Sequence, residues 1–321
     1  MNQENKITSS TTAYPPPVHQ LLTLGKSAID QRCDYAALGL ARSDAPALIR
    51  MATDEQLHNG AQDSPVVWAP IHAWRALVQL RAEEGIAPLV NLFRRLDDEM
   101  DDWVSGNLTK DLAQFGAAAL EPLTAFLANT AHGEWARMAA ARAIGNVGEA
   151  HPELRLDCIA RLGAQLERFA EQTDTLNAFL VSPLWDLRAV EAMPVLERAF
   201  ASGLVDESIN GDLEDVQIQF GLKTEREHPP KPNIMGEKFR AQWAAAGLPL
   251  PDSEGGLQQF QQLLAARRPP PPPFPSAPRR AENGPQRSVP LRQREEVQEV
   301  LREVGQFARL LSQRLVSFGP K

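Results

Sequence analysis

Carboxylates crowd one short stretch of the sequence, LDDEMDDWVSG at residues 96–106, where five acidic residues occupy six positions before a tryptophan. Such a cluster can bind a cation, attract a basic protein, or accept hydrogen bonds from the N–H groups that begin a helix. An EF-hand calcium loop is excluded, because a loop starting at Asp97 would need glycine where Asp102 stands. We expect helix capping by Asp101 or Asp102, with a protein-contact surface and then a metal site as alternatives. The first acidic cluster comprises Asp97, Asp98, Asp101 and Asp102, and Trp103 follows it.

A second acidic cluster lies further along the chain and comprises Asp206, Glu207, Asp212, Glu214 and Asp215. If the chain is built from stacked repeats, equivalent corners line up along one edge. Both clusters could then face the same basic partner. The sequence leaves open whether they share a face.

The third candidate is the row Trp68, His72 and Arg75, whose spacing of i, i+4 and i+7 places them on one helix face. These side chains could bind an anion or an acidic group. The alternative, which we favour, is that His72 hydrogen-bonds a carbonyl or carboxylate of a neighbouring repeat. No nucleophile motif, nucleotide-binding glycine loop or HExxH pair accompanies the row. We therefore expect no catalytic residue, no metal ligands and no cofactor.

A sequence repeat indicates the helices on which these candidate residues lie. Prolines followed by aliphatic residues stand at Pro46, Pro88, Pro122 and Pro194, at intervals of 42, 34 and 72 residues. A period of about 35–45 residues is typical of helical hairpins that stack because no single hairpin buries its own apolar face. Each proline should lie near the first turn of a helix, where its missing N–H costs little. A stripe of small residues from Ala136 to Val147 predicts a closely packed helix that ends near Gly148.

These patterns predict an all-α protein with four parts. Residues 1–17 form a disordered N-terminal tail, and residues 18–222 form an α-solenoid of about five HEAT-like hairpins. Residues 223–290 are a partly helical, proline-rich linker that contains RRPPPPPFPSAPRR. Residues 291–316 form an amphipathic helix. Its apolar positions are Val297, Val300, Val304, Phe307 and Leu311.

Charge is distributed unevenly along the chain. The net charge is −8, but the residues from Arg267 onward carry a surplus of six positive charges, which leaves −14 on residues 1–266. An acidic body is a poor nucleic-acid binder, because phosphate contacts need clustered cations. The two cysteines cannot form a disulfide framework. The sequence shows no signal-peptide pattern and no membrane-length apolar run, so we expect a cytoplasmic protein that does not enter a membrane.

From Ala45 to about Leu222 the sequence resembles a bacterial HEAT-like repeat family, domain of unknown function family 1186. The resemblance rests on APALIRMATDE, VVWAPIHAWRALVQLRAE, DDEMDDW, HPELR, AVEAMPVLERAF and VDESINGDLEDVQIQFGL. It implies an α-solenoid and no settled activity. Some members carry a C-terminal cysteine-rich zinc motif, which this chain lacks because its last cysteine is Cys158. The family tends to have tryptophan where Leu213 stands.

The sequence therefore favours a non-enzymatic protein-interaction module with an acidic solenoid surface and a tethered basic helix. The expected partner is another protein with a basic surface. One alternative is a HEAT-like enzyme or cofactor handler, similar to a bilin lyase or metal-dependent, which would use Trp68, His72, Arg75 and the acidic clusters. A second alternative is an architectural scaffold subunit.

Overall fold

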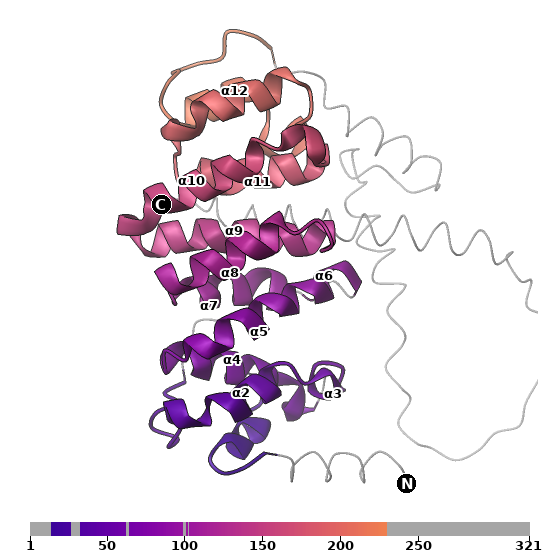
Figure 1. Ribbon diagram of the computed structural model, residues 1–321, viewed down its shortest axis with the longest axis vertical. Helices are drawn as coiled ribbons and strands as arrows, with labels where there is room; N and C mark the ends of the chain where they lie inside the picture. The colour runs from indigo at the N-terminus through magenta and orange to yellow at the C-terminus, as the bar shows by residue number, and fades with distance from the viewer. Residues whose placement is uncertain (1–13, 27–32, 62–63, 99–100, 102, 230–321) are drawn as a thin grey trace, which may run out of the picture. The chain divides into compact units, whose positions relative to one another are not determined.

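Helices are the regular structure of the protein in the computed structural model, which describes residues 14–26, 33–61, 64–98, 101 and 103–229 (Figure 1). No strand occurs in these ranges, so the predicted all-α class is confirmed for them. Among the described helices, none has the length and apolar character needed to cross a bilayer. Asp102, most of the predicted linker and the whole predicted helix at 291–316 lie outside the described residues.

The helices vary from one turn to almost five turns in length. In chain order they are α2 (Ala45–Ala52), α3 (Glu55–His58), α4 (Ala69–Gln79), α5 (Ile86–Asn91), α6 (Arg95–Asp98), α7 (Thr109–Ala113), α8 (Ala117–Ala128), α9 (Glu134–Ala150), α10 (Arg155–Leu166), α11 (Asp174–Asp186), α12 (Met193–Ala201), α13 (Glu207–Asn210) and α14 (Leu213–Gln219). Short 3₁₀ turns lie at Val18–Thr23, Arg42–Asp44, Pro65–Trp68, Glu83–Gly85, Leu92–Arg94, Pro152–Leu154, Phe169–Glu171 and Val190–Ala192, and a π-helical turn lies at Val104–Leu108.

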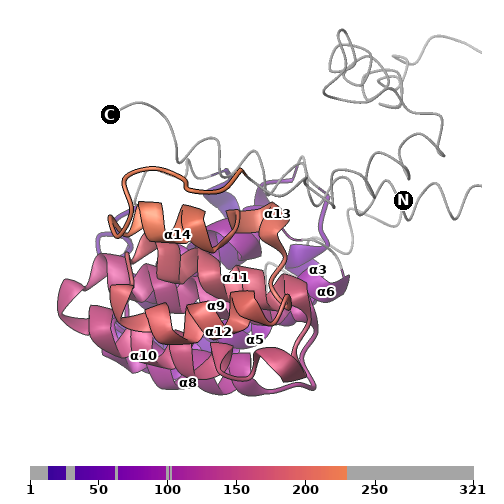
Figure 2. The same cartoon turned by 90° about the horizontal axis from the view of Figure 1, so that it is seen from above.

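The helices pack in pairs that form two rows. The pairs are α2 with α4, α5 with α7, α8 with α9, α10 with α11, and α12 with α14. The first members follow one another in one row and the second members in the other, as Figures 1 and 2 show from two sides. We call the side on which each first member turns into its second member the corner edge.

Helix α9 lies at the centre of the core and packs against α7, α8, α10 and α11. Two of its glycines allow α11 to approach closely, because a Cβ at Gly145 would lie 2.5 Å from Pro183 and one at Gly148 would lie 2.9 Å from Leu187. Helix α9 ends at Ala150, two residues after the stop predicted near Gly148. That glycine serves close helix packing and does not terminate the helix.

The repeated prolines do not all occupy the same helical position. Pro46 and Pro194 lie in the first turns of α2 and α12, as predicted, whereas Pro122 lies inside α8. The prediction fails at Pro122 because α8 already begins at Ala117, directly after Gly116, whose φ of +62° suits glycine.

The described structure includes residues before the predicted boundary at residue 18. Tyr14 is 4% exposed, and its hydroxyl donates a 2.6 Å hydrogen bond to Asp54. The last residues of the predicted N-terminal tail therefore belong to the folded core next to α2.

Candidate binding surface at the corner edge

His72 holds the N-terminal segment against α4. Its Nδ1 lies 2.9 Å from the Tyr35 hydroxyl, and its Nε2 lies 2.9 Å from the Gly25 carbonyl oxygen. The side chain is buried, and burial lowers the pKa of His72, which favours the neutral imidazole. Both ring nitrogens are therefore used within the protein, in keeping with the structural role that the sequence favoured.

Arg75 and its neighbour Trp74 bind one carboxylate of the next helix pair. The Oδ2 atom of Asp111 lies 2.9 Å from Trp74 Nε1 and 3.4 Å from Arg75 Nε. Arg75 is only 9% exposed. A buried guanidinium on an internal carboxylate joins α4 to α7, so Arg75 is not presented to a ligand.

Trp68 turns away from this group towards the first acidic cluster. Its ring packs edge-to-face on Trp103, with centroids 5.0 Å apart and planes at 87°. The Nζ atom of Lys26 lies 5.9 Å from the Trp68 centroid, within the range of a cation–π interaction. Both indoles are only partly buried. The three residues of the predicted row therefore do not form one surface. His72 and Arg75 are bound within the protein, and Trp68 lies at the corner edge.

Asp97 caps a helix that belongs to the following pair. Its Oδ1 accepts a 3.2 Å hydrogen bond from the backbone N–H of Ala136, in the first turn of α9. The N-cap residue of α9 is Gly133, and a Cβ there would lie only 2.2 Å from the Asp97 carboxylate. Glycine therefore leaves the space in which a carboxylate from another pair takes the capping position.

Asp101 caps the helical turn that follows it, as predicted. Its Oδ1 accepts hydrogen bonds from the N–H groups of Trp103 at 3.0 Å and Val104 at 3.1 Å. Its Oδ2 lies 3.5 Å from Arg95 Nε and 3.9 Å from His58 Nδ1. Asp101 thus combines a helix cap with the neutralisation of a buried arginine.

Asp98 is exposed at the end of α6, beside these two capping carboxylates. Asp102 lies outside the described residues.

The second acidic cluster is largely neutralised by cations from the segment that follows α14. Asp212 and Asp215 form a capping box at the start of α14, and Arg226 forms ion pairs with both carboxylates. Lys223 Nζ lies 2.8 Å from Glu214 Oε1, and this ammonium lowers the pKa of Glu214 to about 2. The sequence prediction of an open acidic cluster missed these internal cations, although Lys223 and Arg226 stand close by in the sequence.

The remaining two members of the second cluster lie at the start of α13. Asp206 caps this short helix, since its Oδ1 accepts a 2.9 Å hydrogen bond from the N–H of Ser208. Glu207 is the first residue of the helix, where a carboxylate faces the positive end of the helix dipole.

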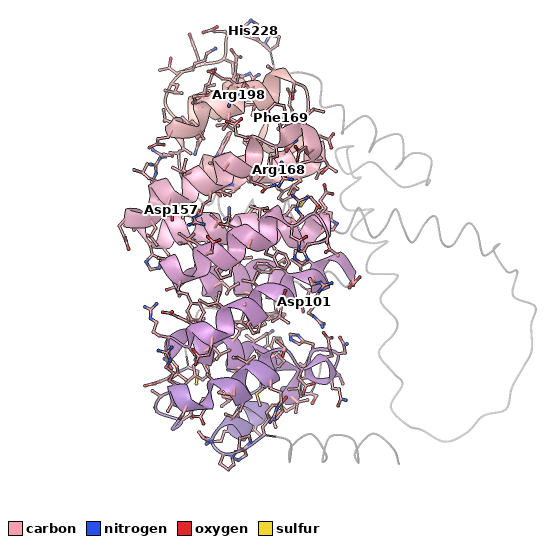
Figure 3. All side chains as sticks on the ribbon, viewed as in Figure 1. Asp101, Asp157, Arg168, Phe169, Arg198 and His228 are labelled. Atoms are coloured by element: carbon pink, nitrogen blue, oxygen red, sulfur yellow. The ribbon has the colours of Figure 1, made fainter. Side chains whose placement is uncertain are left out.

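Contacts between successive pairs place both clusters along the corner edge. Asp97 reaches the start of α9, Glu134 of α9 bonds to Thr173 at the start of α11, and the Asp206 N–H bonds to the Asp174 carbonyl. Two corners therefore separate the clusters, which lie on one edge and do not form one patch. Figure 3 shows Asp101 and Arg168 on this side of the stack and Asp157 on the other.

One group of potential metal ligands exists among the described residues, namely Glu214, Glu227 and His228, whose ligand atoms lie within 4.8 Å of one another. Lys223 already binds Glu214 and Glu227, at 2.8 and 3.3 Å. A metal ion would have to displace this ammonium from both carboxylates, so the geometry favours the ion pairs.

No protein-family model, curated protein or solved structure matches the chain. The resemblance to domain of unknown function family 1186 stays a prediction, and the site must be interpreted from its own geometry.

Proposed function

We propose that the five helix pairs are HEAT-like repeats of an α-solenoid in a cytoplasmic bacterial protein. Hydrogen bonds and ion pairs between pairs join residues 27–44 positions apart, a range that includes the shorter spacings of the prolines. Two turns between pairs also repeat in sequence and conformation. Leu80-Arg81-Ala82 and Leu187-Arg188-Ala189 both place arginine at positive φ, +54° and +47°. Non-glycine residues adopt this conformation infrequently, which favours a shared origin of the two turns.

The function that the geometry supports best is non-enzymatic binding of a basic protein surface at the first acidic cluster. The observation that carries this proposal is the pair of partly exposed indoles, Trp68 and Trp103, beside three described carboxylates. Tryptophan is enriched among the residues that dominate binding energy, and carboxylates attract a basic partner. Lys26 already lies near the face of Trp68, so this ring accepts an ammonium group.

The two acidic clusters differ in what they offer a partner. Arg226 and Lys223 neutralise much of the second cluster, whereas Asp98 in the first is exposed. Asp101 is paired with the buried Arg95, but Asp97 is exposed like Asp98. We therefore assign the partner surface to the first cluster.

Affinity capture from a lysate of the native host, with mass spectrometry of the retained proteins, tests this assignment. The test variant keeps the helix caps and removes charge, since Asn caps as well as Asp. It carries Asp97→Asn and Asp98→Asn and keeps Asp101, the partner of the buried Arg95. The control variant removes the same charge from a turn on the opposite edge, with Glu83→Gln and Glu84→Gln. We expect the test variant to lose a basic partner that the control retains. Equal retention by both variants contradicts the proposal.

A further inference from the structure

Three arginine side chains are buried in the described part of the chain, and one of them has no carboxylate partner. Arg75, Arg95 and Arg137 are 9%, 8% and 8% exposed. Asp111 is the partner of the first, and Glu55 is a partner of the second. No carboxylate oxygen of the described residues lies within 4.0 Å of the Arg137 guanidinium. Because a charge is costly to remove from water without a counterion, an anion is expected beside Arg137.

Arg137 binds neutral groups at two successive corners of the corner edge. Its Nε donates a 2.8 Å hydrogen bond to the Leu127 carbonyl in the last turn of α8, and its Nη2 donates a 3.2 Å hydrogen bond to Gln172 Oε1 before α11. The negative end of the α8 dipole is equivalent to about half an elementary charge, so it offsets only part of the guanidinium charge. The third nitrogen, Nη1, makes no hydrogen bond to a described residue and is not enclosed. It is the nitrogen that a ligand can reach.

Gln172 is held against Arg137 as a neutral partner. Its Oε1 also accepts a 2.6 Å hydrogen bond from Gln165 Nε2. Its Nε2 donates to the Gln165 carbonyl at 3.1 Å and to Asn177 Oδ1 at 2.9 Å. Both ends of the amide are therefore used, and the network fixes which end faces the guanidinium. A glutamate at this position would lack the two donated hydrogen bonds, so the fold supplies an amide here and leaves the arginine charge unmatched.

The charges around Arg137 favour a ligand with a single negative charge. Burial and the charge of Arg168 both lower the pKa of Arg137. Arg168 lies on the corner edge (Figure 3) and pairs with Glu171 at 3.0 Å. Glu134 stands one turn before Arg137 on α9, where it accepts a hydrogen bond from Thr173. One negative charge relieves the repulsion between the two arginines, whereas a phosphate dianion would also be repelled by the two glutamates.

We propose that Arg137, assisted by the charge of Arg168, binds a carboxylate group between the α8–α9 and α10–α11 corners. A carboxylate carries one charge and accepts hydrogen bonds from guanidinium N–H groups. Arg137 supplies Nη1, and the 40% exposed side chain of Arg168 supplies the second cation. The carboxylate of a free organic acid and that of a protein side chain would use the same contacts. The site lies beyond the first acidic cluster along the corner edge, and this inference does not depend on the proposed partner surface.

Thermal unfolding of the full chain in sodium acetate tests the site, with sodium chloride at the same ionic strength as the reference. A ligand that binds only the folded state raises the melting temperature, and about 200 mM acetate on a site with a Kd of about 40 mM should raise it by about 2–4 °C. Arg137→Gln keeps a donor for the Leu127 carbonyl but removes the charge, so it should lose this shift. Arg168→Gln should reduce the shift without abolishing it. The matched control is Arg142→Gln, because Arg142 lies on the same helix and already pairs with Asp186.

Equal acetate shifts in the wild-type chain and in Arg137→Gln overturn the proposal. A larger shift with sodium phosphate than with acetate at equal ionic strength also overturns it, because the site would then prefer a dianion. If Arg137→Gln does not fold, Arg137→Lys takes its place, since lysine keeps the charge but lacks the guanidinium fork, and an undiminished shift in that variant contradicts the assignment.

A second probe, the short peptide acetyl-Gly-Glu-Gly-amide, distinguishes the two sources of the carboxylate. A shift larger than that with acetate at the same concentration, lost in Arg137→Gln, supports a protein side chain as the ligand. An equal or smaller shift that is lost in the same variant supports a free organic acid. A peptide shift that Arg137→Gln retains counts against the site.

Discussion

The capping of α9 by Asp97 leads to a stability prediction that separates a structural carboxylate from a contact carboxylate. Asp97→Ala removes the acceptor of the Ala136 N–H, which lies 3.2 Å away. Loss of an N-cap acceptor costs about 1 kcal/mol, within a range of 0.5–2. Asp98→Ala changes an exposed neighbour and should alter the free energy of unfolding by less than about 0.5 kcal/mol.

Gly133 supplies a sharper form of the same prediction, because its missing Cβ makes room for Asp97. Gly133→Ala should displace the carboxylate and provide no cap, at a cost of about 1 kcal/mol. Gly133→Ser should displace it and supply a hydroxyl cap, at a smaller cost. In the Gly133→Ser background, Asp97→Ala should then cost almost nothing, and this non-additivity is the signature of a shared cap.

Urea unfolding followed by far-UV circular dichroism measures these differences, and thermal unfolding should show a shift of about 2–4 °C per kcal/mol for a chain of this size. The reasoning is refuted if Asp97→Ala and Asp98→Ala are equally stable. It is also refuted if the effects of Asp97→Ala and Gly133→Ser simply add.

Two further predictions concern the core and the N-terminal segment. Gly145→Ala places a methyl group 2.5 Å from Pro183 and should cost about 1–3 kcal/mol in a urea titration, whereas Gly106→Ala meets nothing within 4 Å and should cost nothing or stabilise by up to about 1 kcal/mol. Burial lowers the pKa of His72, so the unfolded chain binds a proton more readily, and stability that is complete above pH ~6.5 declines as the pH falls towards the lower pKa of the folded state. The free energy of unfolding should therefore drop between pH 7.5 and 5.5, and His72→Gln should reduce that drop; an unchanged drop would contradict the assignment.

Local patterns were the part of the fold that sequence could predict. The stripe from Ala136 to Val147 lies on α9 because helical periodicity depends only on neighbouring residues. Asp101 caps the helix directly after it, a relation that spans two or three residues. Proline position was less reliable, because Pro122 fits inside α8 once Gly116 starts that helix earlier.

Relations between pairs could not be predicted, because they depend on how one pair is rotated against the next. The partners of His72, Tyr35 and Gly25, lie 37 and 47 positions away. The hydrogen bond from the Ala136 N–H to Asp97 likewise requires two helix pairs in register. The predicted grouping of Trp68 with His72 and Arg75 failed for the same reason, since Trp68 packs on Trp103 of the neighbouring pair.

The contact between Asp97 and Gly133 limits which segments of such a chain can be inserted or deleted. The longest described helix begins on a carboxylate encoded in the preceding pair, so deletion of residues 86–115 would leave α9 without its cap. Duplication of α8 and α9 alone would create a second Gly133 with no aspartate to fill its space. The unit of insertion and deletion is therefore a segment that runs from one corner to the next, with its boundaries inside the pairs and not between them.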